Sequence, residues 1–466
     1  MTAAQHKGVK PLKVALKNLG CRVNRAELDA IAASLEQAGC ELVGEDEASI
    51  VVVNTCAVTG EAEAKARKSL RHYASLPQVQ SVVATGCMAT LFADEVASLG
   101  EKMQVEVLKT QVASCVLAEA GRLGLADAVA GAGKGLQDRP GGSLQVHESA
   151  PSASASQIAV DSSLLPVTSE AQGTVTPTGR MRPGIKIQDG CDNRCTYCIV
   201  WKARGPARSL SPHEAVAAVS QAVEQGAGEV VLTGIDLGRY DGGIGLAGLL
   251  DQLLVKTKVG RIRLSSVEPV ELSDDLLRLM GDSSGRVAPF LHLPLQSGCD
   301  ATLARMGRPY DTARYRAIVE RARELVPGLA LACDLIVGFP GETAQEFNQS
   351  LEFCRSMDYA NMHVFRYSKR PGTPAAVAPD QVDSQVAHER SRLMRQMARQ
   401  SRTSYLASCI GRQELAFIER PGRAITGGLA EVLVDSGAGF APGSFVKVAS
   451  HSLLPSGQLD GRSATA

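Results

Sequence analysis

Three cysteines lie within one short run of the chain, Gly190-Cys191-Asp192-Asn193-Arg194-Cys195-Thr196-Tyr197-Cys198. Their spacing is C-x3-C-x2-C, and the glycine, aspartate and asparagine among them are typical of a turn rather than of a core segment. Three thiolates on one tight loop can hold three corners of a cubane iron–sulfur cluster, whereas a structural zinc site normally uses four protein ligands. The spacing therefore predicts a 4Fe–4S cluster with one iron left open for a small molecule.

Three more cysteines, Cys21, Cys56 and Cys87, each follow a short apolar run, at residues 14–16, 50–53 and 82–84. Such runs predict buried parallel strands, and ligands of an open α/β sheet gather beyond the carboxyl ends of its strands. We therefore expect these cysteines to converge on one crevice and to hold a second cluster with an open iron. For any one of them alone, plain packing stays an alternative, because free cysteine is a common small core residue.

The two sets of cysteines together resemble the radical S-adenosylmethionine methylthiotransferase family. The local sequence is similar to the subgroup that modifies threonylcarbamoyladenosine in tRNA, and the similar segments are 19–24, 54–59, 186–191, 232–238 and 263–269. The related enzymes that act on isopentenyladenosine in tRNA, or on an aspartate of a ribosomal protein, share both clusters and differ only in such local sequence. They remain alternatives.

The resemblance implies transfer of a methylthio group to carbon 2 of the adenine of N6-threonylcarbamoyladenosine, next to the tRNA anticodon. It also implies two 4Fe–4S clusters and S-adenosyl-L-methionine, since replacing the hydrogen of an unactivated C–H bond needs radical chemistry that a cofactor must carry. One cluster makes the radical, and the other supplies sulfur. A non-catalytic iron–sulfur RNA-binding or electron-transfer protein is the alternative from another class, although such a protein needs no cofactor pocket.

The resemblance further implies cofactor contacts at the predicted strand ends. They are Tyr197, Gly234, Asp236, Ser266, Glu268, Gln296 and Ile336. Tyr197 matches the aromatic position beside the adenine of the cofactor, and Ile336 would contact the same ring. Gly234 lies where a backbone approaches a ligand closely, in the segment that the resemblance assigns to the methionine end. No catalytic residue is assigned beyond the cluster ligands.

Composition divides the chain into an N-terminal α/β domain at 10–120, a segment at 121–178, a radical S-adenosylmethionine core at 179–405 and a tail at 411–460. The second segment is rich in Ala, Gly, Ser, Thr and Pro, so we expect a disordered linker. The core alternates apolar runs with helical stretches, which predicts a partial (β/α)6 barrel with its site at the strand C-terminal ends. The tail predicts a small β-barrel, similar in position to the family's RNA-binding TRAM domain.

The chain of 466 residues contains 12 cysteines, too few for a disulfide scaffold. No apolar signal segment is visible before Leu12 and no run approaches the length of a membrane span, so we expect a cytoplasmic protein with no membrane partner. The 49 basic and 49 acidic residues cancel, and the whole chain carries no charge signal for nucleic acid.

Basic side chains nevertheless gather in four places, at residues 65–71, 202–208, 305–316 and 390–402. Three of these runs begin beside predicted cluster or pocket loops, which favours a rim that binds tRNA phosphates. The balanced charge of the tail makes it a poor phosphate clamp. We expect a monomer that receives electrons from a reduced flavodoxin or a ferredoxin-type donor.

Overall fold

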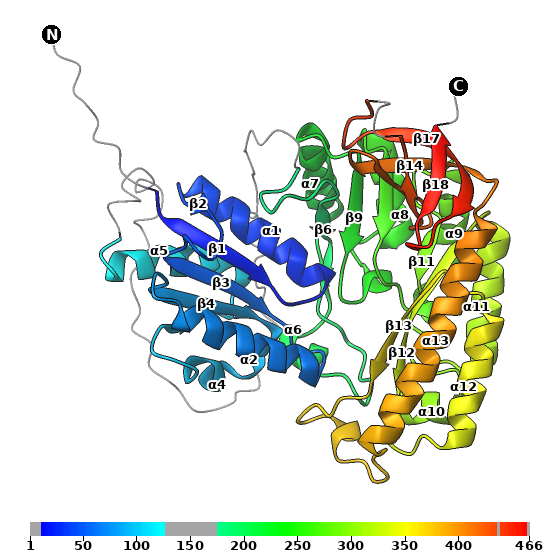
Figure 1. Ribbon diagram of the computed structural model, residues 1–466, viewed down its shortest axis with the longest axis horizontal. Coiled ribbons are helices and arrows are strands. Elements are labelled where there is room, and N and C mark those ends of the chain that lie inside the picture. The colour runs from blue at the N-terminus through cyan, green and yellow to red at the C-terminus, as the bar shows by residue number, and fades with distance from the viewer. Residues whose placement is uncertain (1–10, 126–174, 436–438, 464–466) are drawn as a thin grey trace.

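The computed structural model describes residues 11–125, 175–435 and 439–463. Across these ranges the chain forms an N-terminal parallel sheet, a central set of parallel strands with outer helices, and a C-terminal closed barrel (Figure 1). The predicted α/β fold class with this order of parts is confirmed. Residues 126–174 of the predicted linker lie outside the described residues. In the described part of the chain, no helix combines the length and apolar character needed to cross a bilayer.

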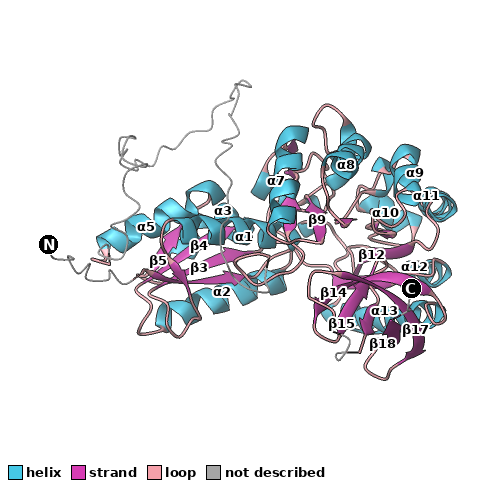
Figure 2. Ribbon diagram, turned by 90° about the horizontal axis from the view of Figure 1, so that it is seen from above, coloured by secondary structure: helices cyan, strands magenta, loops and turns pink. Residues whose placement is uncertain are grey.

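The N-terminal unit is an open parallel sheet in the order β2-β1-β3-β4-β5. Its elements are β1 (Lys13–Asn18), α1 (Arg22–Gln37), β2 (Glu41–Leu42), β3 (Ile50–Thr55), α2 (Gly60–Ser75), β4 (Ser81–Gly86), α3 (Cys87–Leu91), α4 (Ala93–Ala97), β5 (Met103–Val105), the 3-10 turn η1 (Lys109–Gln111) and α5 (Val112–Arg122). Helices α1 and α5 pack on one face of the sheet and α2 on the other (Figure 2). Both faces are covered, which explains why β3 and β4 are buried along their whole length.

The central unit contains all the predicted apolar runs as parallel strands. Its elements are β6 (Gly184–Lys186), β7 (Gln188–Asp189), α6 (Val200–Arg204), β8 (Arg208–Ser209), α7 (Pro212–Glu224), β9 (Glu229–Thr233), η3 (Leu237–Arg239), α8 (Gly245–Lys256), β10 (Arg261–Leu264), η4 (Pro269–Glu271), α9 (Asp274–Asp282), β11 (Phe290–His292), α10 (Asp300–Arg305), α11 (Thr312–Leu325), β12 (Ala330–Val337), α12 (Ala344–Ser356), β13 (Asn361–Arg366), η5 (Pro374–Ala376) and α13 (Ser384–Ser408). One sheet has the order β6-β9-β10 and another the order β11-β12-β13. A parallel bridge between Ser266 and His292 continues the first into the second, giving the open run of strands of a partial barrel.

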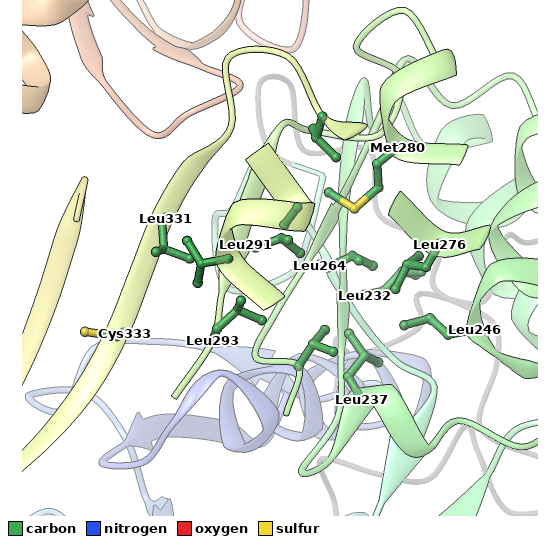
Figure 3. Close-up of a cluster of buried hydrophobic side chains, with 14 of the residues drawn as sticks. Leu232, Leu237, Leu246, Leu264, Leu276, Met280, Leu291, Leu293, Leu331 and Cys333 are labelled. Carbon is green, nitrogen blue, oxygen red and sulfur yellow. The ribbon is translucent and has the colours of Figure 1, made fainter. Parts of the chain in front are cut away.

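Leucines from successive strands fill the space between the barrel strands and the outer helices (Figure 3). Leu232, Leu264 and Leu291 come from β9, β10 and β11, and they share one buried cluster with Met280 of α9 and Leu246 of α8. Burying a leucine stabilises a fold by roughly 1.5–3 kcal/mol. This core therefore fixes the strands, and with them the loops that follow their C-terminal ends.

The C-terminal unit is a closed barrel in the order β14-β15-β16-β18-β17. Its strands are β14 (Gln413–Arg420), β15 (Arg423–Thr426), β16 (Glu431–Leu433), β17 (Phe445–Leu453) and β18 (Leu459–Ser463). Arg261 and Arg263 at the start of β10 donate to its backbone carbonyls, at 3.0 Å for Leu415 and 2.6 Å for Gly427. The predicted small barrel is confirmed, and it docks at the N-terminal ends of the central strands, opposite to the edge that carries the cysteine loop.

Candidate active site

The cysteine loop of the central unit lies between β7 and β8, a short antiparallel pair that brings residues 188–189 against 208–209. The Cys191 N–H donates to the Gly205 carbonyl at 3.1 Å, and the Cys198 N–H donates to the Cys195 carbonyl at 3.0 Å. Burial raises the pKa of the Cys191 thiol to about 12, and the neighbouring Cys198 and Cys195 add to that rise. The three sulfurs are therefore within electrostatic range of one another, as the sequence predicts.

A buried arginine stands beside this loop. Arg308 Nη1 lies 3.1 Å from Cys195 Sγ, and the same guanidinium pairs with Glu268 and bonds the Tyr310 hydroxyl. Burial opposes its charge, but Tyr197, Glu268 and Tyr310 outweigh that effect and hold the pKa of Arg308 well above its ordinary value. The sequence places Arg308 in the basic run 305–316, which favoured a rim for tRNA phosphates, and the structure instead buries it against a predicted cluster ligand and a predicted cofactor contact.

The end of β9 presents buried polar atoms next to the cysteine loop. Asn193 Nδ2 donates to Asp236 Oδ2 at 3.0 Å, while Asp236 Oδ1 is buried and has no partner among the described residues. Burial, with the charges of Glu268 and Glu271, raises the pKa of Asp236 to about 7. Thr233 Oγ1, at the end of β9, and Ser265 Oγ, directly after the neighbouring strand β10, are also buried and have no hydrogen-bond partner among the described residues. Unsatisfied buried groups of this kind need an explanation, and a polar ligand would supply it.

Gly234 is required by a neighbour within the protein. A Cβ at this position would lie 2.8 Å from Gln188 Oε1, which accepts hydrogen bonds from the Ile235 and Asp236 N–H groups at 2.9 and 2.8 Å. The Gln188 side chain thus holds the turn after β9 in place. The predicted ligand contact of Gly234 stays a prediction.

Ser266 begins a chain of side-chain hydrogen bonds that crosses the barrel strands. Ser266 Oγ lies 2.8 Å from His292 Nδ1. His292 Nε2 and His363 Nδ1 each lie 3.0 Å from Asp334 Oδ1, and Asn361 Nδ2 lies 3.0 Å from His363 Nε2. Burial alone would raise the pKa of Asp334, but the bonds from both histidines hold it well below its usual range. Sequence reasoning picked Ser266 and missed the other members, which come from separate strands.

Gln296 and Ile336 meet through their backbones. The Ile336 N–H donates to the Gln296 carbonyl at 2.9 Å, and Gln296 adopts a φ of +68°, which is unfavourable for a side chain other than glycine or asparagine. Ile336 packs with Tyr197 and Phe339, whose rings lie 6.4 Å apart edge to face. Tyr197 and Ile336, the two residues expected to contact the adenine of the cofactor, therefore lie on one apolar surface.

The N-terminal cysteines also lie together, at the C-terminal ends of β1, β3 and β4. Burial raises the pKa of the Cys56 thiol to about 11, and Cys87 and Cys21 reinforce the rise. The Cys21 thiol donates to Asn24 Oδ1 at 3.1 Å, and Asn24 Nδ2 donates to Asn54 Oδ1 at 2.8 Å. These amides tie the start of α1 to the end of β3, so the convergence that the sequence predicts at one sheet edge is observed.

Neither set of sulfurs forms a compact single-ion site. Among the described residues, the group of histidine, cysteine and acidic ligands that lies mutually within 4.8 Å is His292, Asp334 and His363. Zinc–sulfur bonds of about 2.3 Å would bring thiolates about 3.8 Å apart. The wider spacing of the thiols excludes a preformed zinc site of that kind.

The two sets of cysteines are joined by one contact between helices. Helix α3 begins at Cys87 and packs on α6, and Ala203 of α6 is buried in the same cluster as Cys87 and Met88. Next to it, Arg204 Nη1 donates to Glu27 Oε1 at 2.8 Å and to Asp189 Oδ1 at 2.9 Å. The charge of Arg204 opposes the rise that burial causes in the pKa of the Cys87 thiol.

Models of known protein families match both the N-terminal unit and the central unit, which carry the two sets of cysteines. The model of the Radical SAM superfamily matches residues 185–354, and the model described as Uncharacterized protein family UPF0004 matches residues 13–107. The chain is 30% identical over 410 residues to the threonylcarbamoyladenosine tRNA methylthiotransferase MtaB of Thermotoga maritima, covering 87% of this chain and 86% of that one. It is 34% identical over 386 residues to the enzyme of the same name from Bacillus subtilis, covering 81% and 78%.

A relative with another stated substrate is similar to the same extent. The chain is 32% identical over 400 residues to the tRNA-2-methylthio-N(6)-dimethylallyladenosine synthase of a Nocardioides species, covering 84% of this chain and 74% of that one. Among solved structures, TsrM, a radical S-adenosylmethionine methyltransferase from Kitasatospora setae, has a TM-score of 0.53 and 16% identity over 79% of this chain and 74% of its own. That likeness concerns the fold alone. Because the sequence relatives are matched over more than two thirds of their own lengths, the chain belongs to the radical S-adenosylmethionine methylthiotransferase family.

Proposed function

We propose that this protein transfers a methylthio group to carbon 2 of the adenine of N6-threonylcarbamoyladenosine, adjacent to the anticodon of tRNA. The observation that carries the proposal is the contact between α3 and α6. One helix begins at Cys87 and the other begins two residues after Cys198, so both sets of thiols border one junction. The names of relatives from Thermotoga maritima and Bacillus subtilis support this substrate.

The residues present fit two iron–sulfur clusters. All twelve cysteines are free thiols, and each proposed set offers sulfur donors alone: Cys191, Cys195 and Cys198 for one cluster, and Cys21, Cys56 and Cys87 for the other. Burial raises the pKa of the Cys56, Cys87, Cys191 and Cys198 thiols, so these thiols need a metal or a cation to ionise. Arg308 and Arg204 supply a positive charge beside each set.

When bound, two 4Fe–4S clusters and S-adenosylmethionine supply the radical that removes a hydrogen atom and the sulfur that replaces it. The protein side chains then have positioning roles. The unpaired Asp236 Oδ1 and Ser265 Oγ offer hydrogen bonds to the polar methionine end of the cofactor. Tyr197 and Ile336 form an apolar wall for its adenine. A reduced flavodoxin or ferredoxin-type protein would provide the electron.

Two cysteine variants test whether the two sets of thiols support different steps of the reaction. The full-length protein is reconstituted anaerobically with iron, sulfide and reductant, and is given S-adenosylmethionine and an anticodon stem–loop RNA that carries threonylcarbamoyladenosine. Cys195→Ala is expected to abolish release of 5′-deoxyadenosine. Cys56→Ala is expected to keep that release and to form no methylthiolated nucleoside in mass spectra. Cys115→Ala, on the outer helix α5, is the control and should retain both.

Two results would contradict the proposal. A wild-type protein that carries both clusters and cleaves S-adenosylmethionine but leaves the RNA unmodified would refute the substrate. Methylthiolated RNA from the Cys56→Ala variant would refute the role of the N-terminal thiols.

A further inference from the structure

Arg22 projects from the N-terminal unit toward the barrel. It follows Cys21 directly and is the first residue of α1. Residues three, four and seven positions apart share one face of a helix, and on this face Ala26 lies against Gly184 of β6, while Asp29 bonds Thr178. Figure 1 shows the first turn of α1 at the side of the N-terminal unit that faces the barrel strands. Arg22 therefore lies beside a predicted cluster ligand and points at the barrel.

The charge of Arg22 is uncompensated. Within the described residues the structure gives its guanidinium no hydrogen bond or ion pair, although other arginines around the junction are paired: Arg182 with Glu229 and Arg204 with Glu27. Solvent reaches the side chain, and the positive charges of Arg263 and Arg182 act on it as well.

The nearest opposing charge does not neutralise Arg22. Asp334 of β12 favours its positive charge, but that carboxylate already accepts hydrogen bonds from His292 and His363 at 3.0 Å. Asp334 and Arg263 lie on the barrel strands β12 and β10, so charged groups of the barrel act on Arg22. An unpaired cation in such a position is an anion-binding group.

We propose that Arg22 binds the carboxylate of the threonylcarbamoyl group and thereby selects this substrate. The inference rests on the proposed function and adds the group that recognises the modification. Threonine is attached through its amino nitrogen in this nucleoside, so its carboxylate is free, and a guanidinium binds a carboxylate through two parallel hydrogen bonds. An isopentenyl substituent is apolar and offers no partner to this cation, so covering Arg22 with it would remove water from the charge without supplying a partner.

The methionine part of S-adenosylmethionine carries a carboxylate too. We place the methionine end of the cofactor beside Asp236. The charges that act on Asp236 belong to Glu268, Glu271, Arg239 and Arg308. The charges that act on Arg22 belong instead to Arg263, Arg182 and Asp334. The structure therefore favours the nucleoside carboxylate as the partner of Arg22, and the experiment separates the two.

The test compares the reconstituted full-length wild type with Arg22→Gln, using three anticodon stem–loop RNAs. One carries threonylcarbamoyladenosine, the second its neutral threoninamide analogue, and the third isopentenyladenosine. Hydrogen bonds to a charged group lead us to expect that Arg22→Gln weakens binding of the acid RNA on the order of 10- to 100-fold, measured by fluorescence anisotropy. Binding of the two uncharged RNAs should not change.

Two further variants make the result specific to the charge and position of Arg22. Arg22→Lys keeps the charge but loses the two-pronged geometry, so it should recover part of the preference for the acid RNA. Arg355→Gln removes an exposed arginine from the outer helix α12 and should leave all three affinities unchanged. Iron content is measured for every variant, so that loss of a cluster is recognised.

Three outcomes are decisive. Equal weakening of the acid and amide RNAs by Arg22→Gln would overturn the inference and assign Arg22 to the RNA backbone. A raised KM for S-adenosylmethionine in cleavage without RNA, with an unchanged preference for the acid over the amide, would overturn it in favour of the cofactor carboxylate. If the wild type forms no methylthiolated product, the proposed function fails, and the binding measurements still decide whether Arg22 recognises a carboxylate.

Discussion

Arg308 contacts both a proposed cluster ligand, Cys195, and a proposed cofactor contact, Glu268. Its guanidinium touches Cys195 Sγ at 3.1 Å and pairs with Glu268. A buried charge needs a partner, and here the sulfur lies at one terminal nitrogen of the guanidinium and the carboxylate at the other. Ionising three thiols in one loop accumulates negative charge, which this arginine partly offsets.

We expect Arg308→Met to lose the iron bound by the C-x3-C-x2-C loop. The variant leaves Glu268 partly buried without its cation and removes the donor to Cys195, so the thiolates of that loop become harder to form. Total iron per chain should fall by about half, because the N-terminal thiols keep their own cluster. Release of 5′-deoxyadenosine should disappear with it. Iron analysis and the electron paramagnetic resonance spectrum of the reduced protein measure both effects.

Arg305→Met is the matched control, since Arg305 is an exposed arginine that pairs with Glu346 on the outside of the barrel. It should keep the full iron content. An Arg308→Met protein with undiminished iron and an unaltered spectrum would show that the guanidinium does not support the cluster.

The residue scale is also where prediction from sequence reaches its limit. Spacing alone indicated Cys191, Cys195 and Cys198, because ligands on one loop are close in sequence. Arg308 was missed because its partner Cys195 lies 113 residues away in the chain. The histidine pair around Asp334 was missed for the same reason, with separations of 42 and 29 residues. Only the fold brings such groups together.

At the scale of elements, the turn between β4 and α3 decides where Cys87 points. Gly86 has a φ of +95°, and a Cβ there would lie 2.3 Å from the Thr55 carbonyl oxygen. Adjacent strands β3 and β4 are paired along this stretch, with Thr55 opposite Gly86. The glycine lets the chain turn into α3 directly at the strand end and delivers Cys87 to the crevice.

Gly86→Ala should therefore destabilise the N-terminal unit and weaken its cluster. A left-handed backbone costs an alanine about 1–2 kcal/mol, and the steric overlap costs roughly 1–3 kcal/mol more. Urea unfolding, followed by circular dichroism, measures the loss, and iron analysis reports the cluster. Gly100→Ala is the control, because its Cβ would meet only Ala74 Cβ at 3.8 Å. Equal stability of the two variants would contradict the proposed role of Gly86.

Sequence predicted the long elements better than the short ones. The buried runs of β3 and β4 were found, because several apolar residues follow one another in each. The pair β7 and β8 was missed, since two residues per strand carry no period, yet this pair encloses the cysteine loop. The start of helix α1 at Arg22 carries no capping signal in the sequence, because its N-cap residue Cys21 makes no side-chain cap hydrogen bond.

For the molecule as a whole, two buried charge networks fasten the outer units to the barrel. Arg204 links Glu27 of α1 to Asp189 of β7, directly before the cysteine loop. At the other edge, Glu229 binds Arg261 and Arg263, whose remaining donors reach carbonyls of the C-terminal barrel. Breaking one partner of a buried network is more damaging than never having built it. These contacts therefore hold the N-terminal unit and the C-terminal barrel in place relative to the central strands.

Glu229 gives this arrangement a pH dependence. Burial opposes its ionisation, but Arg263, Arg261 and Arg182 outweigh that effect and lower the pKa of Glu229 from 4.5 to about 2. A carboxyl with a depressed pKa in the folded state contributes stability that is complete above its unfolded pKa and is lost as the pH falls toward the folded pKa. The shift corresponds to roughly 3 kcal/mol. The free energy of unfolding should therefore fall as the pH drops from about 5 to about 2.

Glu229→Gln tests this contribution directly. At pH 7 the variant leaves Arg261, Arg263 and Arg182 without their carboxylate, which should lower the free energy of unfolding by about 3–5 kcal/mol. Because the glutamine cannot titrate, the difference from wild type should shrink between pH 5 and pH 2. Urea unfolding of the cluster-free chain at several pH values measures it, since acid dissolves iron–sulfur clusters. Glu47→Gln removes an exposed partner of Lys13 and should change little. A difference between Glu229→Gln and wild type that stays constant down to pH 2 would show that Glu229 is not the group that links docking of the C-terminal barrel to pH.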